Sequence, residues 1–272
     1  MAESVIALII RPEEDDADSA GVFVEVRLDG TMREFVLDTG AGGTTLALDP
    51  FTESLPVVRM RSSGGVFQRI EDDRVALGRL CIGPIERYGI EVARSRRPGT
   101  RSLLGMDVLG RHRLAFDFAA ARCEVDQPLP WQGIEAALDL VVGSAGHPYV
   151  DIAFEGANAS AVWDTGAGVT VVDARFIAEH PESFQSVGAS TGTDSTGARL
   201  ETPVCLMAAS RIGGLDFPPH RVVSVDLTVL NQGTDRRTDM ILGWPTLSKA
   251  RWVFDFPARR WGLAPPTASP PP

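Results

Sequence analysis

The chain contains Phe35-Val-Leu-Asp-Thr-Gly-Ala-Gly42 and repeats it as Ala161-Val-Trp-Asp-Thr-Gly-Ala-Gly168. The two aspartates, Asp38 and Asp164, are 164 − 38 = 126 residues apart, close to half of the 272-residue chain. In each copy an apolar run leads directly into Asp-Thr-Gly, so we expect the acid at the rigid tip of a strand. If a two-fold arrangement brings the two acids into contact, they cannot both ionise comfortably. One then stays protonated while the other is a base.

The duplication extends well beyond these eight residues. Without a gap, residues 22–30 align with residues 148–156, and both segments alternate apolar and polar residues before an acidic residue and a glycine. This pattern predicts a strand that enters a hairpin turn. Further along, residues 103–109 align with residues 241–247, and each segment is followed by Phe-Asp-Phe. The offset there is 241 − 103 = 138, so the second copy carries 138 − 126 = 12 additional residues.

The size of the chain suits two domains that each contain one copy of the repeat. We predict an N-terminal lobe at residues 1–127, a C-terminal lobe at residues 128–264 and a Pro-rich disordered tail at residues 265–272. Short β-branched runs separated by Gly, Pro, Asn and Asp are typical of an all-β fold. Short helices are expected at residues 173–180, with Asp173 as the cap, and at residues 245–250.

Composition excludes several classes of function. The net charge is −10, from 26 basic and 36 acidic residues, which argues against nucleic acid or an anionic membrane as the partner. Residues 1–11 contain only six consecutive apolar residues, too few for a signal peptide or a membrane span. We expect a strand there, paired with its counterpart at residues 138–142. The cysteines Cys81, Cys123 and Cys205 form no metal-ligand pattern with the histidines, which predicts free thiols, no metal, no cofactor and a cytoplasmic location.

The residues after each aspartate indicate how the acids are held. Gly40 and Gly166 let the chain turn tightly, so that backbone N–H groups point at the carboxylates and favour their ionised form. Thr39 and Thr165 are expected to hydrogen-bond across the two-fold axis and tie the two tips together.

This pattern resembles the aspartic proteases. The motif Asp-Thr-Gly-Ala-x-x-Thr, a later apolar-apolar-Gly and a closing Phe-Asp-Phe occur twice, over nearly all of residues 20–264. Because Ala41 and Ala167 follow the glycines, each half is more similar to a retropepsin subunit than to a pepsin lobe. The resemblance implies two pseudo-symmetric lobes with a cleft between them, and an endopeptidase with Asp38 and Asp164 as its catalytic pair. It further implies a monomer that binds extended peptides.

The same family covers its cleft with a mobile hairpin, the flap. The glycine-bearing candidates for the flap tips are Gly64 and Gly65 in the first copy, and Gly192 and Gly197 in the second. Alanine after Asp-Thr-Gly supplies no hydroxyl to stabilise a carboxylate, so we expect a pair less acidic than that of pepsin and an optimum nearer neutral pH. Trp163, directly before the second aspartate, is unusual for the family.

Two further pairs of equivalent residues receive structural roles. We expect Gly105 and Gly243 to allow a close approach of backbones beneath the site. Asp117 and Asp255, within the Phe-Asp-Phe segments, are expected to cap turns or face solvent rather than take part in catalysis.

Two alternatives remain open. The duplicated fold could serve as a catalytically silent peptide-binding or docking module, although two intact aspartates favour catalysis. Actin-like and sugar-kinase-like phosphate binders also use a strand followed by Asp-x-Gly-x-x-Thr, which residues 38–44 superficially fit. Those folds need several long helices, which the sequence does not predict. Lys249 is the only lysine in the chain, and it lies in no phosphate-binding motif.

Overall fold

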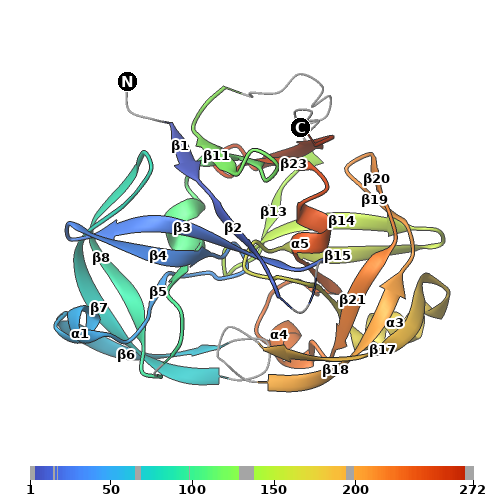
Figure 1. The fold of residues 1–272 in the computed structure, drawn as a ribbon, viewed down its shortest axis with the longest axis horizontal. Helices are drawn as coiled ribbons and strands as arrows, with labels where there is room; N and C mark the ends of the chain where they lie inside the picture. The colour runs from blue at the N-terminus through green and yellow to red at the C-terminus, as the bar shows by residue number, and fades with distance from the viewer. Residues whose placement is uncertain are drawn as a thin grey trace.

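The computed structural model describes residues 4–14, 16, 18–64, 69–97, 99–128, 138–193 and 199–266. Within these ranges the chain is mostly β and its helices are short, which confirms the predicted all-β class (Figure 1). The helices are α1 (Pro50–Glu53), α2 (Met106–Leu109), α3 (Ala174–Glu179), α4 (Thr228–Gln232), α5 (Trp244–Leu247) and the 3-10 helix η1 (Pro181–Ser183). The described strands form three sheets, which we name the N-terminal, C-terminal and shared sheets.

The N-terminal sheet contains, in spatial order, β2 (Ile9–Pro12), β3 (Ala20–Leu28), β4 (Thr31–Leu37), β9 (Leu103–Leu104), β5 (Thr45–Leu46), β8 (Ile85–Ser95), β7 (Arg69–Ile82) and β6 (Val57–Gly64). An additional pairing of β3 with β7 folds the sheet back on itself. In β3 the alternation of the sequence is reproduced, because Val24 and Val26 are buried while Glu25 and Arg27 are exposed. The predicted hairpin is present, with β3 and β4 joined at Asp29-Gly30.

The C-terminal sheet contains, in spatial order, β17 (Phe184–Thr193), β18 (Arg199–Met207), β21 (His220–Val225), β16 (Thr170–Asp173), β22 (Met240–Leu242), β15 (Ala157–Trp163), β14 (Pro148–Phe154), β19 (Ser210–Ile212) and β20 (Leu215–Phe217). Strand β13 (Val141–Val142) pairs with β14. The hairpin of β14 and β15 turns at Glu155-Gly156 and corresponds to the hairpin of β3 and β4.

The pairing registers reproduce the sequence duplication. In the first copy β4 runs parallel to β9, with Val36 opposite Leu103. In the second copy β15 runs parallel to β22, with Val162 opposite Ile241. These partners are related by the two sequence offsets, since 36 + 126 = 162 and 103 + 138 = 241. The strand before each aspartate and the later apolar strand align between the copies with different offsets, 126 and 138, yet the two strands pair with each other in the same register in both halves.

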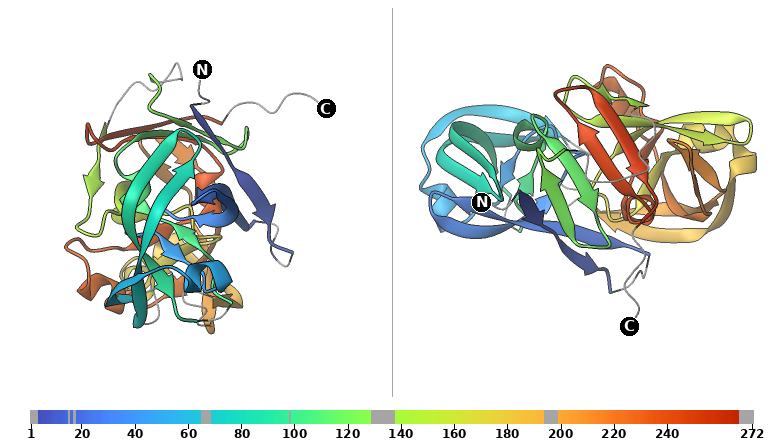
Figure 2. Two further views of the ribbon diagram at one scale, coloured as in Figure 1. Left: turned by 90° about the vertical axis from the view of Figure 1, so that its left-hand side faces the viewer. Right: turned by 90° about the horizontal axis from the view of Figure 1, so that it is seen from above.

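The shared sheet takes strands from both halves of the chain. Its order is β1 (Val5–Ala7), β11 (Arg122–Val125), β10 (Arg113–Asp117), β23 (Arg251–Asp255), β24 (Arg260–Ala264) and β12 (Leu138–Asp139). Its centre is the antiparallel pair β10 and β23, in which Leu114 lies opposite Phe254. Seen from above in Figure 2, the green strands of the first half and the red strands of the second lie side by side.

The expected pairing of the first strand with residues 138–142 is wrong. Strand β1 pairs with β11 of its own half, and β12 pairs with β24 of the second half. They occupy opposite edges of the shared sheet. In each copy the first strand pairs with the last strand of the same copy. The equivalent strands β1 and β12 therefore lie at the two edges of the sheet, as far apart as its order allows.

The two expected helices are both present. Helix α3 begins after Asp173, whose side chain accepts a hydrogen bond from the Arg175 N–H at 3.2 Å. Helix α5 is one turn, begins one residue before the expected Pro245 and ends at Leu247 rather than Ala250. No helix in the described part of the chain is long and apolar enough to cross a membrane. The predicted tail lies outside the described residues from position 267 onward.

Candidate active site

The fold brings Asp38 and Asp164 together. Asp38 directly follows β4 and Asp164 directly follows β15, the second strand of each hairpin, and the Asp164 carboxyl is close enough to raise the pKa of Asp38. The tips are in close contact as well. A Cβ atom on Gly40 would lie 2.3 Å from Oδ2 of Asp164, and one on Gly166 would lie 2.6 Å from Cγ of Asp38. Glycine is therefore required at both positions by the carboxyl group of the opposite tip.

The two carboxyl groups have different surroundings. Oδ1 of Asp164 accepts hydrogen bonds from the N–H of Gly40 at 3.1 Å and the N–H of Gly166 at 2.7 Å. Burial and the adjacent Asp164 carboxyl raise the pKa of Asp38 well above the ordinary value, against weaker opposition from the N–H groups of Gly40 and Ala41. Burial also raises the pKa of Asp164, but the two glycine N–H groups oppose it. The two N–H bonds to Oδ1 of Asp164 therefore favour the ionised form of Asp164 over that of Asp38.

The expected threonine brace is present in full. Oγ1 of Thr39 donates to the Trp163 carbonyl at 2.8 Å and accepts from the Thr165 N–H at 3.0 Å. In the equivalent bonds, Oγ1 of Thr165 donates to the Leu37 carbonyl at 2.6 Å and accepts from the Thr39 N–H at 3.1 Å. Both threonines are buried, at 0% and 2% exposure, so the four bonds are shielded from water. The brace holds the two tips in one fixed relation.

A second layer of contacts lies beneath the first tip. A Cβ atom on Gly105 would lie 2.6 Å from the carbonyl carbon of Gly43, which confirms the expected close backbone approach. Thr44 donates through Oγ1 to Asp107 at 2.7 Å and through its N–H to the same oxygen at 2.9 Å. The sequence reasoning assigned no role to Asp107. Its position two residues after Leu-Leu-Gly was the available signal.

The second tip has a comparable layer with different residues. A Cβ atom on Gly243 would lie 2.2 Å from the Val169 carbonyl oxygen, so this close approach is also confirmed. Oγ1 of Thr170 accepts from the Gly243 N–H at 3.2 Å and contacts Oγ1 of Thr246 at 3.2 Å. The Ala167 carbonyl accepts from the N–H of Trp244, the first residue of α5, and the Ala41 carbonyl accepts from the N–H of Met106, the first residue of α2, at 2.9 Å in each case.

Trp163 anchors the second tip in an aromatic cluster. Its fully buried ring lies 4.9 Å from Phe116 of β10 and 4.7 Å from Phe254 of β23, measured between ring centroids. These partners come from the central pair of the shared sheet, one from each half. Trp163 therefore ties the strand carrying Asp164 to the sheet that joins the two halves.

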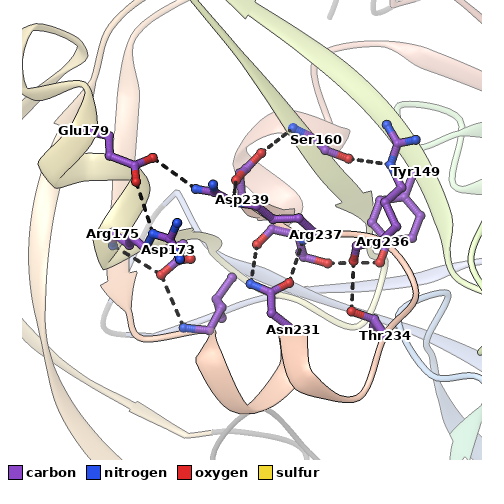
Figure 3. A network of polar contacts seen from close by, with 12 residues as sticks. Tyr149, Ser160, Asp173, Arg175, Glu179, Asn231, Thr234, Arg236, Arg237 and Asp239 are labelled. Carbon is purple, nitrogen blue, oxygen red and sulfur yellow. Dashed lines mark hydrogen bonds and ion pairs between the residues drawn. The ribbon is translucent and has the colours of Figure 1, made fainter.

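A polar network that includes the buried Asp239 also contacts this strand. Figure 3 shows Arg237 between Glu179 of α3, at 3.2 Å, and Asp239, at 2.6 Å. Asp239 in turn accepts from the N–H of Ser160 in β15 at 2.9 Å, and its carbonyl accepts from the N–H of Asp173 at 2.8 Å. Asp239 thereby connects the strand that leads to the second tip, through its carboxylate, with the cap residue of α3, through its carbonyl.

The flap candidates lie in two long hairpins. Gly64 is the last residue of β6, opposite Arg69 of β7, and Gly192 lies in β17 opposite Leu200 of β18. Gly65 and Gly197 lie outside the described residues. The hairpins are on the same side of the molecule in Figure 1, at its lower edge. That they cover the aspartates stays a prediction.

Asp117 and Asp255 cap turns, as expected. Oδ1 of Asp117 accepts from the Ala120 N–H at 3.1 Å, and Oδ1 of Asp255 accepts from the Ala258 N–H at 3.0 Å. Asp117 is 1% exposed and Asp255 is partly buried, so neither faces solvent. Asp255 also forms an ion pair with Arg113 across the two halves at 2.5 Å.

No known protein family model matches this chain, and no curated protein matches it. The functional assignment consequently depends on the geometry of the paired aspartates.

Proposed function

We propose that this protein is an aspartic endopeptidase in which Asp38 and Asp164 activate a water molecule for attack on a peptide bond. The observation that carries the proposal is the close approach of two acidic tips, one from each half of the chain, which four threonine hydrogen bonds hold together. Two such groups share one negative charge and one proton, which supplies a base and an acid at the same point. The braced tips keep this arrangement rigid, as general acid–base catalysis requires.

The asymmetry of the pair assigns the roles. Asp164, whose Oδ1 accepts two glycine N–H bonds, is the base that takes a proton from the water. The resulting hydroxide attacks the carbonyl carbon, and Asp38 donates its proton to the carbonyl oxygen. These transfers give a tetrahedral diol and leave Asp38 ionised. The proton now on Asp164 then passes to the nitrogen as the C–N bond breaks, while Asp38 takes back a proton from one diol hydroxyl, so that the products are a carboxylic acid and an amine. The complete cycle returns the pair to one proton and one negative charge.

The finer architecture belongs to the same proposal. We propose two retropepsin-like lobes, residues 1–127 and 128–264, with the substrate cleft between them and the two hairpins as flaps. The equivalent registers of β4–β9 and β15–β22 support this division. The shared sheet already joins both halves within one chain, which supports a monomer. The three cysteines form no disulfide, in keeping with a reducing cytoplasmic location.

The alternatives differ in what they require. A docking module would bind extended peptides without cleaving them, and it needs neither the pairing nor the brace. A phosphate binder needs long helices, whereas the helices in the described part of the chain are three to six residues long. We therefore retain the silent binding module as the second candidate.

The test is cleavage of a mixed peptide library by the wild type, Asp38→Asn and Asp164→Asn. The control is Asp139→Asn, which removes a charge from a side chain that is 93% exposed. We expect the control to cleave like the wild type. Each catalytic variant should lose activity by a factor of about 10²–10⁴ or more, because neither aspartate works without its partner. Near-normal cleavage by either one refutes the paired mechanism. A wild type that binds peptides but cleaves none would establish the docking module instead.

A further inference from the structure

A cavity of about 570 Å³ lies along the strand that leads to Asp38. Its walls come from β2, β3 and β4, from the residues before β9 and from the segment between β5 and α1. This volume is within the range of sites that hold small molecules or parts of larger ligands. The sequence reasoning did not identify it.

The cavity is adjacent to the catalytic pair. Val36, in its wall, precedes Asp38 by two residues. The N–H groups of both residues donate to the neighbouring segment, at Ser102 and Leu104, so the chain is extended there and the two side chains lie on the same face, roughly 7 Å apart. Val36 is also opposite Phe23 of β3, a second wall residue. Two residues of an extended peptide span about the same roughly 7 Å. A peptide whose scissile bond lies at Asp38 therefore reaches this cavity with a side chain one or two residues away.

The charges in the wall are not balanced. Arg11 forms two hydrogen bonds to the carboxylate of Glu34, at 2.6 and 2.5 Å. Arg33 is paired with Asp49. Arg101, by contrast, has no carboxylate partner within the described ranges. The three arginines and two acids leave one positive charge in a protein whose net charge is −10.

The guanidinium of Arg101 is held over an aromatic ring. Its Cζ atom lies 5.4 Å from the ring centroid of Phe23, while Arg11 lies over the same ring at 4.8 Å. Phe23 is only 5% exposed, because the two arginines and its strand enclose it. This contact positions the Arg101 side chain without using its N–H donors. The donors stay available for a carboxylate, which guanidinium binds with two parallel hydrogen bonds.

We infer that this cavity is a specificity pocket for an acidic side chain, and that Arg101 selects substrates with Asp or Glu one or two residues from the scissile bond. The inference rests on the proposed proteolytic function. The expected preference for Glu over Gln is about tenfold in kcat/KM, the factor provided by one well-formed charge-assisted contact.

The experiment uses sets of peptides that differ only by Glu, Gln or Lys at one position on either side of the cleaved bond. The wild type should prefer Glu at one such position. Arg101→Gln should remove the preference, and Arg101→Glu should reverse it in favour of Lys. The matched control is Arg27→Gln, which removes the same charge from an exposed position of β3 outside the cavity. This control should keep the wild-type preference.

Two outcomes overturn the inference while the proposed function stands. The wild type could cleave Glu and Gln peptides equally well at every position, or Arg101→Gln could retain the full preference. If the wild type cleaves no peptide, the proposed function fails separately. The same peptides are then compared by fluorescence anisotropy, and a Glu peptide that binds no tighter than its Gln counterpart refutes the pocket as well.

Discussion

The threonine brace gives the most demanding test of the site geometry. Replacing Thr39 by valine keeps the shape of the side chain but removes Oγ1. The Trp163 carbonyl and the Thr165 N–H then lose their partners, at 2.8 and 3.0 Å, inside a site where Thr39 is fully buried. A buried group without a partner costs about 1–3 kcal/mol, so two such groups cost about 2–6 kcal/mol. This is a large share of the stability of a typical domain.

Thr165 makes the same two hydrogen bonds from the other tip, so the prediction applies to it as well. Thr165→Val orphans the Leu37 carbonyl and the Thr39 N–H in the same way, so its cost should be similar. The free energy of unfolding is measured by urea titration of both variants. The control is Thr31→Val, an exposed position at the start of β4, which should change stability by less than about 0.5 kcal/mol.

A local measurement separates the brace from general destabilisation. In Thr39→Val, hydrogen exchange followed by NMR should show that the Thr165 amide loses its protection, because its acceptor is gone. A Thr39→Val protein as stable as the Thr31 control, with the Thr165 amide still protected, would refute the reasoning.

Four further predictions follow from the same site and core. Asp38→Asn should be more stable than the wild type at pH 7. The pKa of Asp38 is higher in the folded protein than in the unfolded chain, so as the pH rises the unfolded chain loses the Asp38 proton before the folded protein does. The free energy of unfolding of the wild type therefore falls as the pH rises from the unfolded to the folded pKa. The difference should vanish at low pH in urea titrations, where both states are protonated. The pH-rate profile of peptide cleavage should peak above pH 4, with an alkaline limb set by loss of the Asp38 proton; a maximum well below pH 4 contradicts the raised pKa values of Asp38 and Asp164. Gly40→Ala should abolish cleavage because its Cβ would lie 2.3 Å from Oδ2 of Asp164, whereas Gly43→Ala, whose Cβ would meet only a carboxylate oxygen at 3.9 Å, should remain active in the same assay. Burial raises the pKa of the Cys123 thiol, so a thiol reagent at pH 8 should modify it only after unfolding in urea; rapid modification in the native protein would disprove its burial.

The sequence determined the elements that alternation and duplication encode. The hairpin of residues 22–30 and its copy at residues 148–156 follow from a period of two ended by an acidic-Gly turn. The contact of Thr39 with Thr165 was predictable, because identical tips on equivalent strands were expected to meet, and their hydrogen bonds are reciprocal.

Strand order was beyond the reach of the sequence. The first strand was expected beside residues 138–142 because the two segments are alike, but β1 lies against β11. Two segments with similar sequences occupy equivalent places in the two halves, but equivalent strands need not pair with each other. Which edges meet is decided by the packing of whole hairpins.

The chemical difference between Asp38 and Asp164 also came from tertiary structure alone. The two residues occur in identical Asp-Thr-Gly-Ala-Gly segments, yet Asp164 is the one that accepts both glycine N–H bonds on a single oxygen. The positive charge of Arg101 is a further case, because a residue's partners can be counted only when distant segments meet. Local patterns carry information about periodicity and turns, which act between neighbours in the chain. Protonation, pairing and pocket charge depend on what folding places a few ångströms away, and these properties of the site were decided only in three dimensions.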